Sequence, residues 1–203
     1  MQALNGILGK ASHLRVLRAL HRAGEPLTGR EVQRRADMSN RAVMLALEEL
    51  TRLQVVLCEA HTDHHAYQLN PRHFFYKRGI RPALDAEEHF WDDLRRLVRR
   101  TLSPRPIAAI VTGSIARDEA ETDETLQLHL LYQTGRERLQ SYRGLDTLRA
   151  RTASRYSLGV HATFMDLRNM DDPEFRSLWR RIAREGVLLF GDLPVTGGDP
   201  AQE

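Results

Sequence analysis

Cysteine, lysine and long apolar runs are all scarce in this chain of 203 residues. Its single cysteine, Cys58, excludes an internal disulfide and any zinc site made of four cysteines. No run approaches the roughly 20 apolar residues of a membrane span. The N-terminal residues also lack the apolar segment of a secretory signal peptide. We therefore expect a cytoplasmic protein with no membrane partner.

The composition is otherwise that of a globular protein, with 41% hydrophobic and 28% charged residues. This balance excludes a wholly disordered chain. Only two of the 30 basic residues are lysines, so nearly every cation is a guanidinium group. The planar guanidinium suits phosphates and base edges, although a G·C-rich genome produces the same bias.

Charge is unevenly distributed along the chain. Residues 1–80 hold 12 basic and 7 acidic residues, whereas residues 81–203 hold 18 basic and 20 acidic residues. A basic first part and a nearly neutral second part indicate two domains with separate roles. We predict an α+β or α/β two-domain protein, with a basic first domain at 1–80, a bridging helix at 81–104, a second domain at 105–195 and a disordered tail at 196–203.

The first domain is predicted to consist of three helices and a β-hairpin, which is the element order of a winged helix-turn-helix. Thr28 and Glu31 form a capping box that begins the second helix. Ser39 is a suitable N-cap for the third helix. The predicted helices span residues 12–22, 28–36 and 40–53, and the predicted strands span 55–59 and 66–69.

In this kind of module the third helix enters the major groove with its N-terminal residues first. Arg41 can pair with guanine and Asn40 with adenine. Thr28 and Arg30 begin the second helix, where hydroxyl and guanidinium groups commonly hold phosphates. The predicted DNA contacts are Thr28, Arg30, Ser39, Asn40, Arg41, Met44, His64 and His65. A polar face that merely covers a helical core is the alternative.

Four segments together resemble the MarR/ArsR-like winged helix-turn-helix transcription regulators over about residues 10–72. They are LTGREV (27–32), ADMSNRAV (36–43), LEELTRLQVV (47–56) and YQLN (67–70). The resemblance implies that the recognition helix and the wing bind double-stranded DNA, usually as a homodimer.

The wing departs from that family because its tip carries histidines and Asp63 where arginine or lysine is usual. Histidine is mostly uncharged near neutral pH, which weakens phosphate contacts. The alternation of His61, Asp63 and His65 also suggests three metal ligands on one hairpin, but no fourth ligand completes the site. We predict a solvated turn and no metal.

The second part of the chain alternates strands and helices, which predicts an α/β or α+β domain. A helix over residues 85–102 precedes it, and its apolar stripe runs from Phe90 to Leu102. The later predicted elements are strands at 107–111, 126–131, 160–166 and 187–190 and helices at 136–156 and 173–184. The width of the stripe predicts a homodimer interface within residues 85–102.

The segments VTGSIARDEAETDETLQLHLL (111–131) and REGVLLFG (184–191) resemble the minimal nucleotidyltransferase superfamily over about residues 105–192. Gly113, Ser114, Ala116 and Arg117 match its Gly-Ser turn. The resemblance implies a nucleotidyltransferase-like mixed sheet with helices. It also implies a phosphate-binding turn and two metal-binding aspartates on the next strand.

Those two aspartate positions fall on Thr125 and Gln127. The alternating leucines at 126, 128 and 130 fix the strand's apolar face, so Glu121 and Asp123 are left in the preceding loop. Asp166 alone makes a poor metal site. We therefore predict a pseudoenzyme domain with no catalytic residues, metal or cofactor.

The turn residues Gly113, Ser114 and Arg117 remain candidates for binding a nucleotide or phosphate, although Gly113 also suits the turn alone. Arg96 and Arg99 or Arg100 share a helix face that could extend such a surface or simply be solvated. The predicted function is a DNA-binding transcription regulator whose inactive second domain serves ligand sensing or dimerisation. The alternatives are a metal-dependent nucleotidyltransferase with an altered site and an antitoxin-like interaction protein.

Overall fold

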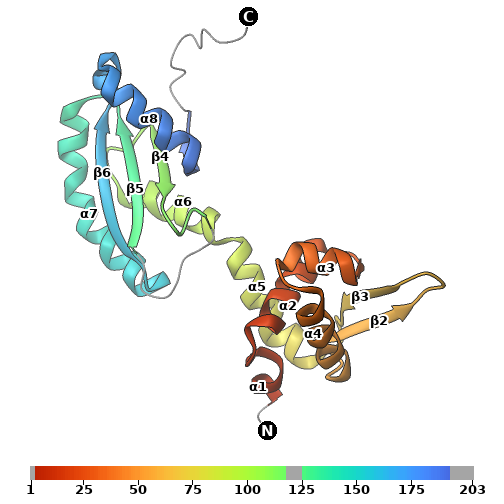
Figure 1. The fold of residues 1–203 in the computed structure, drawn as a ribbon. Coiled ribbons are helices and arrows are strands. Elements are labelled where there is room, and N and C mark those ends of the chain that lie inside the picture. Colours follow the sequence, from red (N-terminus) through yellow and green to blue (C-terminus); the bar gives the residue numbers. More distant parts are fainter. Residues whose placement is uncertain (1–2, 118–124, 193–203) are drawn as a thin grey trace, which may run out of the picture. The chain divides into compact units, whose positions relative to one another are not determined.

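The computed structural model describes residues 3–117 and 125–192. The chain divides into two compact units, with the boundary between His89 and Phe90 (Figure 1). The predicted tail at 196–203 and the loop carboxylates Glu121 and Asp123 lie outside the described residues. Within the described residues, no helix is both long enough and apolar enough to cross a membrane.

The first unit contains helices around a small antiparallel sheet of strand order β1-β3-β2. Its elements are α1 (Ala3–Leu8), α2 (Ala11–Ala23), β1 (Leu27–Thr28), α3 (Gly29–Ala36), α4 (Asn40–Arg52), β2 (Val56–Ala60), β3 (His65–Leu69), the π-helix η1 (Tyr76–Ile80) and α5 (Arg81–Glu88). From α2 to β3 the three helices and the hairpin follow the predicted order, with the short strand β1 added between α2 and α3. Strand β1 and helices α1 and η1 were not predicted.

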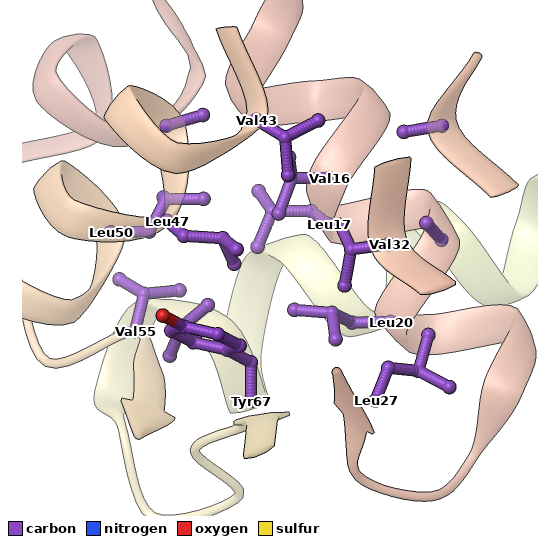
Figure 2. Packing of buried hydrophobic residues seen from close by; sticks show 14 of the residues in the cluster. Val16, Leu17, Leu20, Leu27, Val32, Val43, Leu47, Leu50, Val55 and Tyr67 are labelled. Carbon is purple, nitrogen blue, oxygen red and sulfur yellow. The ribbon is translucent and has the colours of Figure 1, made fainter. Parts of the chain in front are cut away.

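The core of the first unit packs α2, α3 and α4 against one another and against the sheet. Val16, Leu17, Val43, Leu47 and Leu50 are fully buried there, and Figure 2 shows their side chains interlocked. These positions recur at helical spacing, so burial of one stripe on each helix fixes which face of α4 points outward.

The helix boundaries are set by the end signals in the sequence. Helix α2 ends at Gly24, whose φ of 66° is favourable for glycine. The predicted capping box of Thr28 and Glu31 is present, and the Ser39 hydroxyl accepts from the Ala42 amide at 3.4 Å. The predicted helices and strands of this unit are confirmed with shifts of one residue at several ends.

The second unit contains a four-stranded mixed sheet of order β6-β5-β4-β7. Strands β5 and β6 are parallel, whereas β4 pairs antiparallel with both β5 and β7. Its elements are α6 (Phe90–Thr101), β4 (Ala108–Thr112), β5 (Thr125–Tyr132), α7 (Gly135–Tyr156), β6 (Gly159–Asp166), the 3₁₀ helix η2 (Leu167–Asp171), α8 (Pro173–Glu185) and β7 (Val187–Gly191). The predicted strands and helices from residue 107 onward are confirmed.

The two faces of this sheet carry different cores. One face packs against α6 and α7 through a cluster that includes Leu126, Leu128 and Leu148. The opposite face packs against α8 through a smaller cluster that includes Ile110 and Trp179. The leucine phase predicted for β5 is therefore correct.

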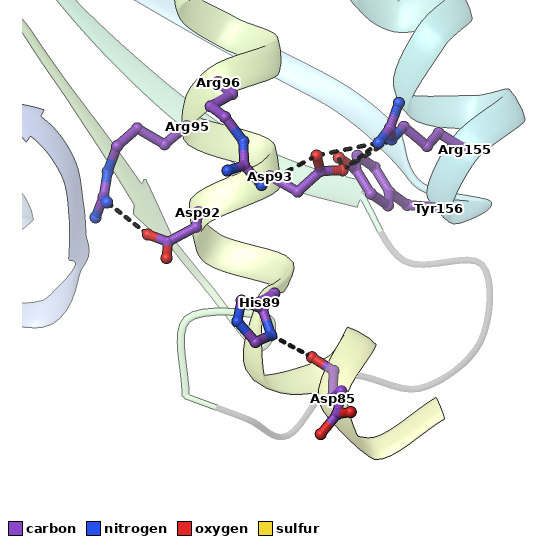
Figure 3. Close-up of polar contacts among 8 residues, drawn as sticks. All are labelled: Asp85, His89, Asp92, Asp93, Arg95, Arg96, Arg155 and Tyr156. Atoms are coloured by element: carbon purple, nitrogen blue, oxygen red, sulfur yellow. Dashed lines mark hydrogen bonds and ion pairs between the residues drawn. The ribbon is translucent and has the colours of Figure 1, made fainter. Parts of the chain in front are cut away.

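The prediction of one helix over residues 85–102 is wrong. Helices α5 and α6 replace it and are separated at His89. The carbonyl of Asp85 accepts from the His89 amide at 3.1 Å and contacts the His89 ring Nδ1 at 2.6 Å (Figure 3). Leu84 is buried in the first unit and Leu94 in the second. Helical periodicity shows that both residues are apolar positions of a helix, but it does not show that they are buried in different cores.

The predicted domain limits at 80 and 105 change for the same reason, because α5 belongs to the first unit and α6 to the second. The apolar stripe predicted as a dimer interface is also reassigned. Leu94, Val98 and Leu102 are buried in the second unit's own core. Phe90, Trp91 and Leu97 are partly buried against that core, so most of the stripe packs within its own unit.

Candidate nucleic-acid interface

Helix α4 presents its polar residues outward because its apolar stripe is buried. Asn40 and Arg41 are exposed in its first turn. Met44 is 41% exposed and Leu45 is 52% exposed on the next turn. The outward face of the predicted recognition helix therefore begins polar and continues with two accessible apolar side chains.

A groove of about 420 Å³ lies between the start of α3, the outward face of α4 and the wing formed by β2 and β3. Six of the eight predicted DNA contacts line it, and Ser39 and Arg41 are the two that do not. The full lining is Thr28, Gly29, Arg30, Asn40, Met44, Asp63, His64, His65 and Tyr67. Residues that are distant in sequence are thus brought together on one surface.

Three lining residues, Gly29, Asp63 and Tyr67, were not predicted. A Cβ at Gly29 would lie 3.3 Å from Met44 Sδ and 3.9 Å from the Tyr67 ring. Glycine at this position therefore allows α3, α4 and β3 to approach closely. The β3 register places Tyr67 opposite Leu27, and this cross-strand pairing could not be derived from the local sequence pattern.

Two of the predicted contacts already act as helix caps. The Thr28 hydroxyl donates to Glu31 Oε2 at 2.8 Å, and it accepts from the Glu31 amide at 3.3 Å. The hydrogen bonds from Thr28 lower the pKa of Glu31, with the backbone bond contributing most. Ser39 caps α4 in a similar way. These hydroxyls hold the helix starts in place whether or not a phosphate is bound.

The cations of this surface are Arg30 and Arg41, and both are exposed. Within the described residues neither side chain has an acidic partner at ion-pair distance. Exposed guanidinium groups without internal partners are available for phosphates or base edges.

The wing tip is ordered by its histidines. The His61 amide donates to the His64 carbonyl at 2.8 Å, and the two rings stack with centroids 5.0 Å apart. Farther along the hairpin, Cys58 Sγ lies 3.8 Å from His65 Nδ1. Over the described residues, no group of three His, Cys, Asp or Glu side chains is placed to hold a metal ion.

The predicted phosphate turn of the second unit follows β4. Gly113 has a φ of +91°, which favours glycine, and its Cα faces the side chain of Gln127. The amide of Arg117 donates to the carbonyls of Gly113 and Ser114, so this segment is a turn. The side chain of Gln127 lies over the glycine, with its Cγ 3.4 Å from the position a Cβ would take.

Polar residues occupy the end of the α8-facing sheet surface beyond the core. This polar ladder is defined as Thr112, Gln127, His129, His161 and Thr163, which the strand register places side by side. Among the described residues of β4, β5 and β6 on this face, none is Asp or Glu. The surface therefore offers hydroxyl, amide and imidazole groups.

His129 is the most constrained member of the polar ladder. Its Nε2 lies 2.8 Å from Thr112 Oγ1, and its Nδ1 is buried without a hydrogen-bond partner among the described residues. Burial lowers the pKa of His129, and His161 adds a smaller effect in the same direction. The folded protein therefore favours the neutral imidazole.

Asp166, the remaining carboxylate considered from sequence, lies on the other face of the sheet. It pairs in register with Tyr132, which belongs to the core beneath α6 and α7. Asp166 is 8% exposed and forms an ion pair with Arg138 at 3.3 Å. It cannot share a metal ion with side chains of the polar ladder.

No family model matches this sequence, and no curated protein matches it. Among solved structures, the chain is similar to the Adhesin competence repressor (AdcR) from Streptococcus pyogenes, with 16% identity and a TM-score of 0.32 over 45% of this chain and 62% of that one. It is also similar to human N-acetylserotonin methyltransferase (ASMT), solved in complex with SAM. There the identity is 14% and the TM-score 0.31, over 74% of this chain and 43% of the human protein. The chain thus spans less than two thirds of either protein, and similarity at this level assigns no function.

Proposed function

We propose that this chain is a transcription regulator of the MarR/ArsR-like winged-helix type. Its first unit binds double-stranded DNA with α4 in the major groove. The observation that carries the proposal is the single groove that gathers six of the eight predicted DNA contacts from α3, α4 and the wing. A polar face that merely covers a helical core would not need side chains from α3, α4 and the wing to line one groove.

The contacts follow from the position of each group. Asn40 and Arg41 stand in the first turn of α4, where a recognition helix meets base edges. Arg30 stands at the start of α3 and contacts phosphate. His64 and His65 bring the wing to the same groove, with weaker phosphate contacts than arginine would make at neutral pH.

The second unit is proposed to be a nucleotidyltransferase-like domain that has no catalytic activity. Support comes from β5, where Thr125 and Gln127 lie at the positions of the expected aspartates. Asp166 lies on the opposite face of the sheet and is paired with Arg138. Without an anionic pair among the described residues of this face, two divalent metals lack the carboxylate ligands that would let them bridge a nucleotide's phosphates.

A homodimer remains part of the proposal for an energetic reason. One recognition helix reads one half-site, and useful discrimination against a genome usually needs two half-sites. Leu94, Val98 and Leu102 of the α6 stripe are buried within their own unit and are not available for that interface.

One observation favours the antitoxin-like alternative. Met44 and Leu45 are both exposed on the outward face of α4, and adjacent apolar side chains of this kind also suit a protein partner. A protein that fails to bind any duplex but is captured through α4 by a defined toxin-like partner would fit this alternative.

The test is a gel shift with the DNA upstream of the protein's own gene. The double variant Asn40→Ala/Arg41→Ala should lose the specific complex. The matched control, Arg136→Ala/Arg143→Ala, removes two exposed cations from α7 and should retain it. Loss of the complex in both variants, or in neither, would contradict the proposed recognition helix.

A further inference from the structure

A second groove, entirely within the second unit, lies between α6 and α7. It measures about 440 Å³ and is lined by four arginines, one aspartate, Ser154 and Leu97. We propose that this groove binds a small anion carrying several phosphate groups, such as the polyphosphate part of a nucleotide. The site is distinct from the Gly113 turn.

The four arginines are arranged in two pairs. Arg96 and Arg100 are four residues apart on α6, and Arg151 and Arg155 are four residues apart on α7. Residues at this spacing share a helix face and lie about 6 Å apart along the axis. Packed helices lie about 8–10 Å apart, so the four guanidinium groups border a patch of roughly one nanometre. This is the scale of a short polyphosphate.

One of the arginines is held in a fixed orientation. Arg155 donates to Asp93 through Nε at 2.8 Å and through Nη2 at 3.0 Å, and the Tyr156 hydroxyl donates to the same carboxylate at 2.6 Å. Figure 3 shows this cluster beside Arg96, which lies 3.6 Å from Asp93. These bonds do not use Nη1 of Arg155. A guanidinium fixed in advance loses less conformational entropy when a ligand binds.

Arg100 and Arg151 add positive charge that is not compensated within the groove. Asp93 is the one carboxylate among the lining residues. Within the described residues, Arg100 has no acidic partner, and Arg151 contacts only the Thr101 hydroxyl, at 3.4 Å. Four cations around one anion repel one another. A multivalent anion relieves that repulsion and accepts charge-assisted hydrogen bonds from several guanidinium groups.

A small ligand fits these observations better than a duplex. The volume of the groove is in the range of small-molecule sites. Ser154 adds a hydroxyl donor and Leu97 adds an apolar edge, which suits a ligand with an organic part. Proteins bind duplex DNA with cations spread along its row of phosphates, whereas these four arginines form a compact group.

The test is calorimetric titration of the full chain with inorganic tripolyphosphate and, separately, with duplex DNA. Arg100→Ala/Arg151→Ala should weaken tripolyphosphate binding by at least about tenfold, because two charge-assisted contacts are lost. The control Arg136→Ala/Arg143→Ala removes the same charge from exposed positions outside the groove, and its affinity should stay within about twofold. Arg100→Lys/Arg151→Lys keeps the charge but lacks the paired N–H donors of the guanidinium group, and it should give an intermediate affinity.

Three results would overturn the proposal. They are no tripolyphosphate binding by the wild type, equal weakening in the control, and an equal loss of duplex affinity in the groove variant. The last result would assign the groove to the DNA backbone. Circular dichroism of each variant separates loss of binding from loss of fold. The gel shift with the α4 variant is independent of this outcome, so either proposal can fail alone.

Discussion

Thr28 and Glu31 bind each other reciprocally at the start of α3. The Thr28 amide donates to Glu31 Oε2 at 2.8 Å, and the Glu31 amide donates to Thr28 Oγ1 at 3.3 Å. This pair fixes the first turn of the helix that carries Arg30 and borders the groove. Thr28 therefore supports the proposed DNA-binding surface mainly by holding the backbone of α3.

Removing this cap should reduce stability. Thr28→Ala should lower the free energy of unfolding by about 1 kcal/mol, because an amide at the start of α3 loses its acceptor. Thr28→Ser keeps the hydroxyl and should stay close to the wild type. Urea unfolding of the three proteins measures the difference. Equal stability of the alanine and serine variants would show that the capping box contributes nothing.

The two proposed DNA-contacting arginines should behave differently. Arg41→Ala should weaken specific binding by about 1–3 kcal/mol and relax the preference at one base pair, because a base-edge contact is lost. Arg30→Ala should lower the affinity for all DNA sequences by the same factor, since a phosphate contact is lost. It should also reduce the slope of log affinity against log salt concentration by about one. Anisotropy titrations against a set of single-base operator variants distinguish the two patterns. Identical patterns for both variants would contradict the assigned roles.

Stability should depend on pH through His129. The folded protein disfavours the charged imidazole, so the unfolded chain takes up this proton first as the pH falls through the usual histidine pKa of about 6.5. The stabilising contribution is present above that pH and is lost on acidification. His129→Gln should therefore lose less stability than the wild type between about pH 7.5 and pH 5.5. Urea unfolding at both pH values checks this, and an equal loss in the two proteins argues against it.

The α6 stripe should behave as a core and not as a dimer interface. Leu94 is fully buried, so Leu94→Ala should cost about 2–5 kcal/mol through lost burial and a cavity. The cost should not depend on protein concentration. Unfolding at two widely spaced concentrations is the check, together with sedimentation of the variant and the wild type. If Leu94→Ala is as stable as the wild type but monomeric where the wild type is dimeric, the α6 stripe is a dimer interface after all.

Nucleotidyl transfer should be absent. With Mg²⁺ or Mn²⁺ and labelled nucleoside triphosphates, we expect no label on protein, RNA or small acceptors, because the polar ladder has no carboxylate to hold the metals. Metal-dependent transfer that is abolished by Asp123→Ala or Asp166→Ala would contradict this prediction. It would show that these carboxylates bind the metals although the strand register does not place them with Thr125 and Gln127.

Most helices and strands of both units were predictable because their signals are local. The Thr28 capping box, the Ser39 cap and the alternating leucines of β5 each occupy a few neighbouring residues, and each is present in the structure. The break at His89 was not predictable from periodicity. It arises because Leu84 and Leu94 are buried in different cores, and helical spacing does not identify the core.

The candidate site was predictable residue by residue but not as a surface. Asn40 and Met44 were each predicted as DNA contacts from their places in the third helix. The contribution of Tyr67 depends on the pairing of β3 with β1, and that of Gly29 depends on the close approach of Met44. Contacts of this kind join segments far apart in sequence. For the arginine groove, the sequence grouped only the α6 residues Arg96 and Arg100. Its α7 members, Arg151 and Arg155, come from a helix distant in sequence.

The central claim is that the first unit binds duplex DNA through Arg30 and the start of α4. Titrating a fluorescent duplex of arbitrary sequence at low salt, with the wild type and with Arg30→Ala/Arg41→Ala in parallel, tests it most directly. We predict binding by the wild type that weakens linearly with the logarithm of salt concentration, and a clear loss of affinity in the double variant. Absence of duplex binding by the wild type at low salt, or unchanged binding by the double variant, would contradict the claim.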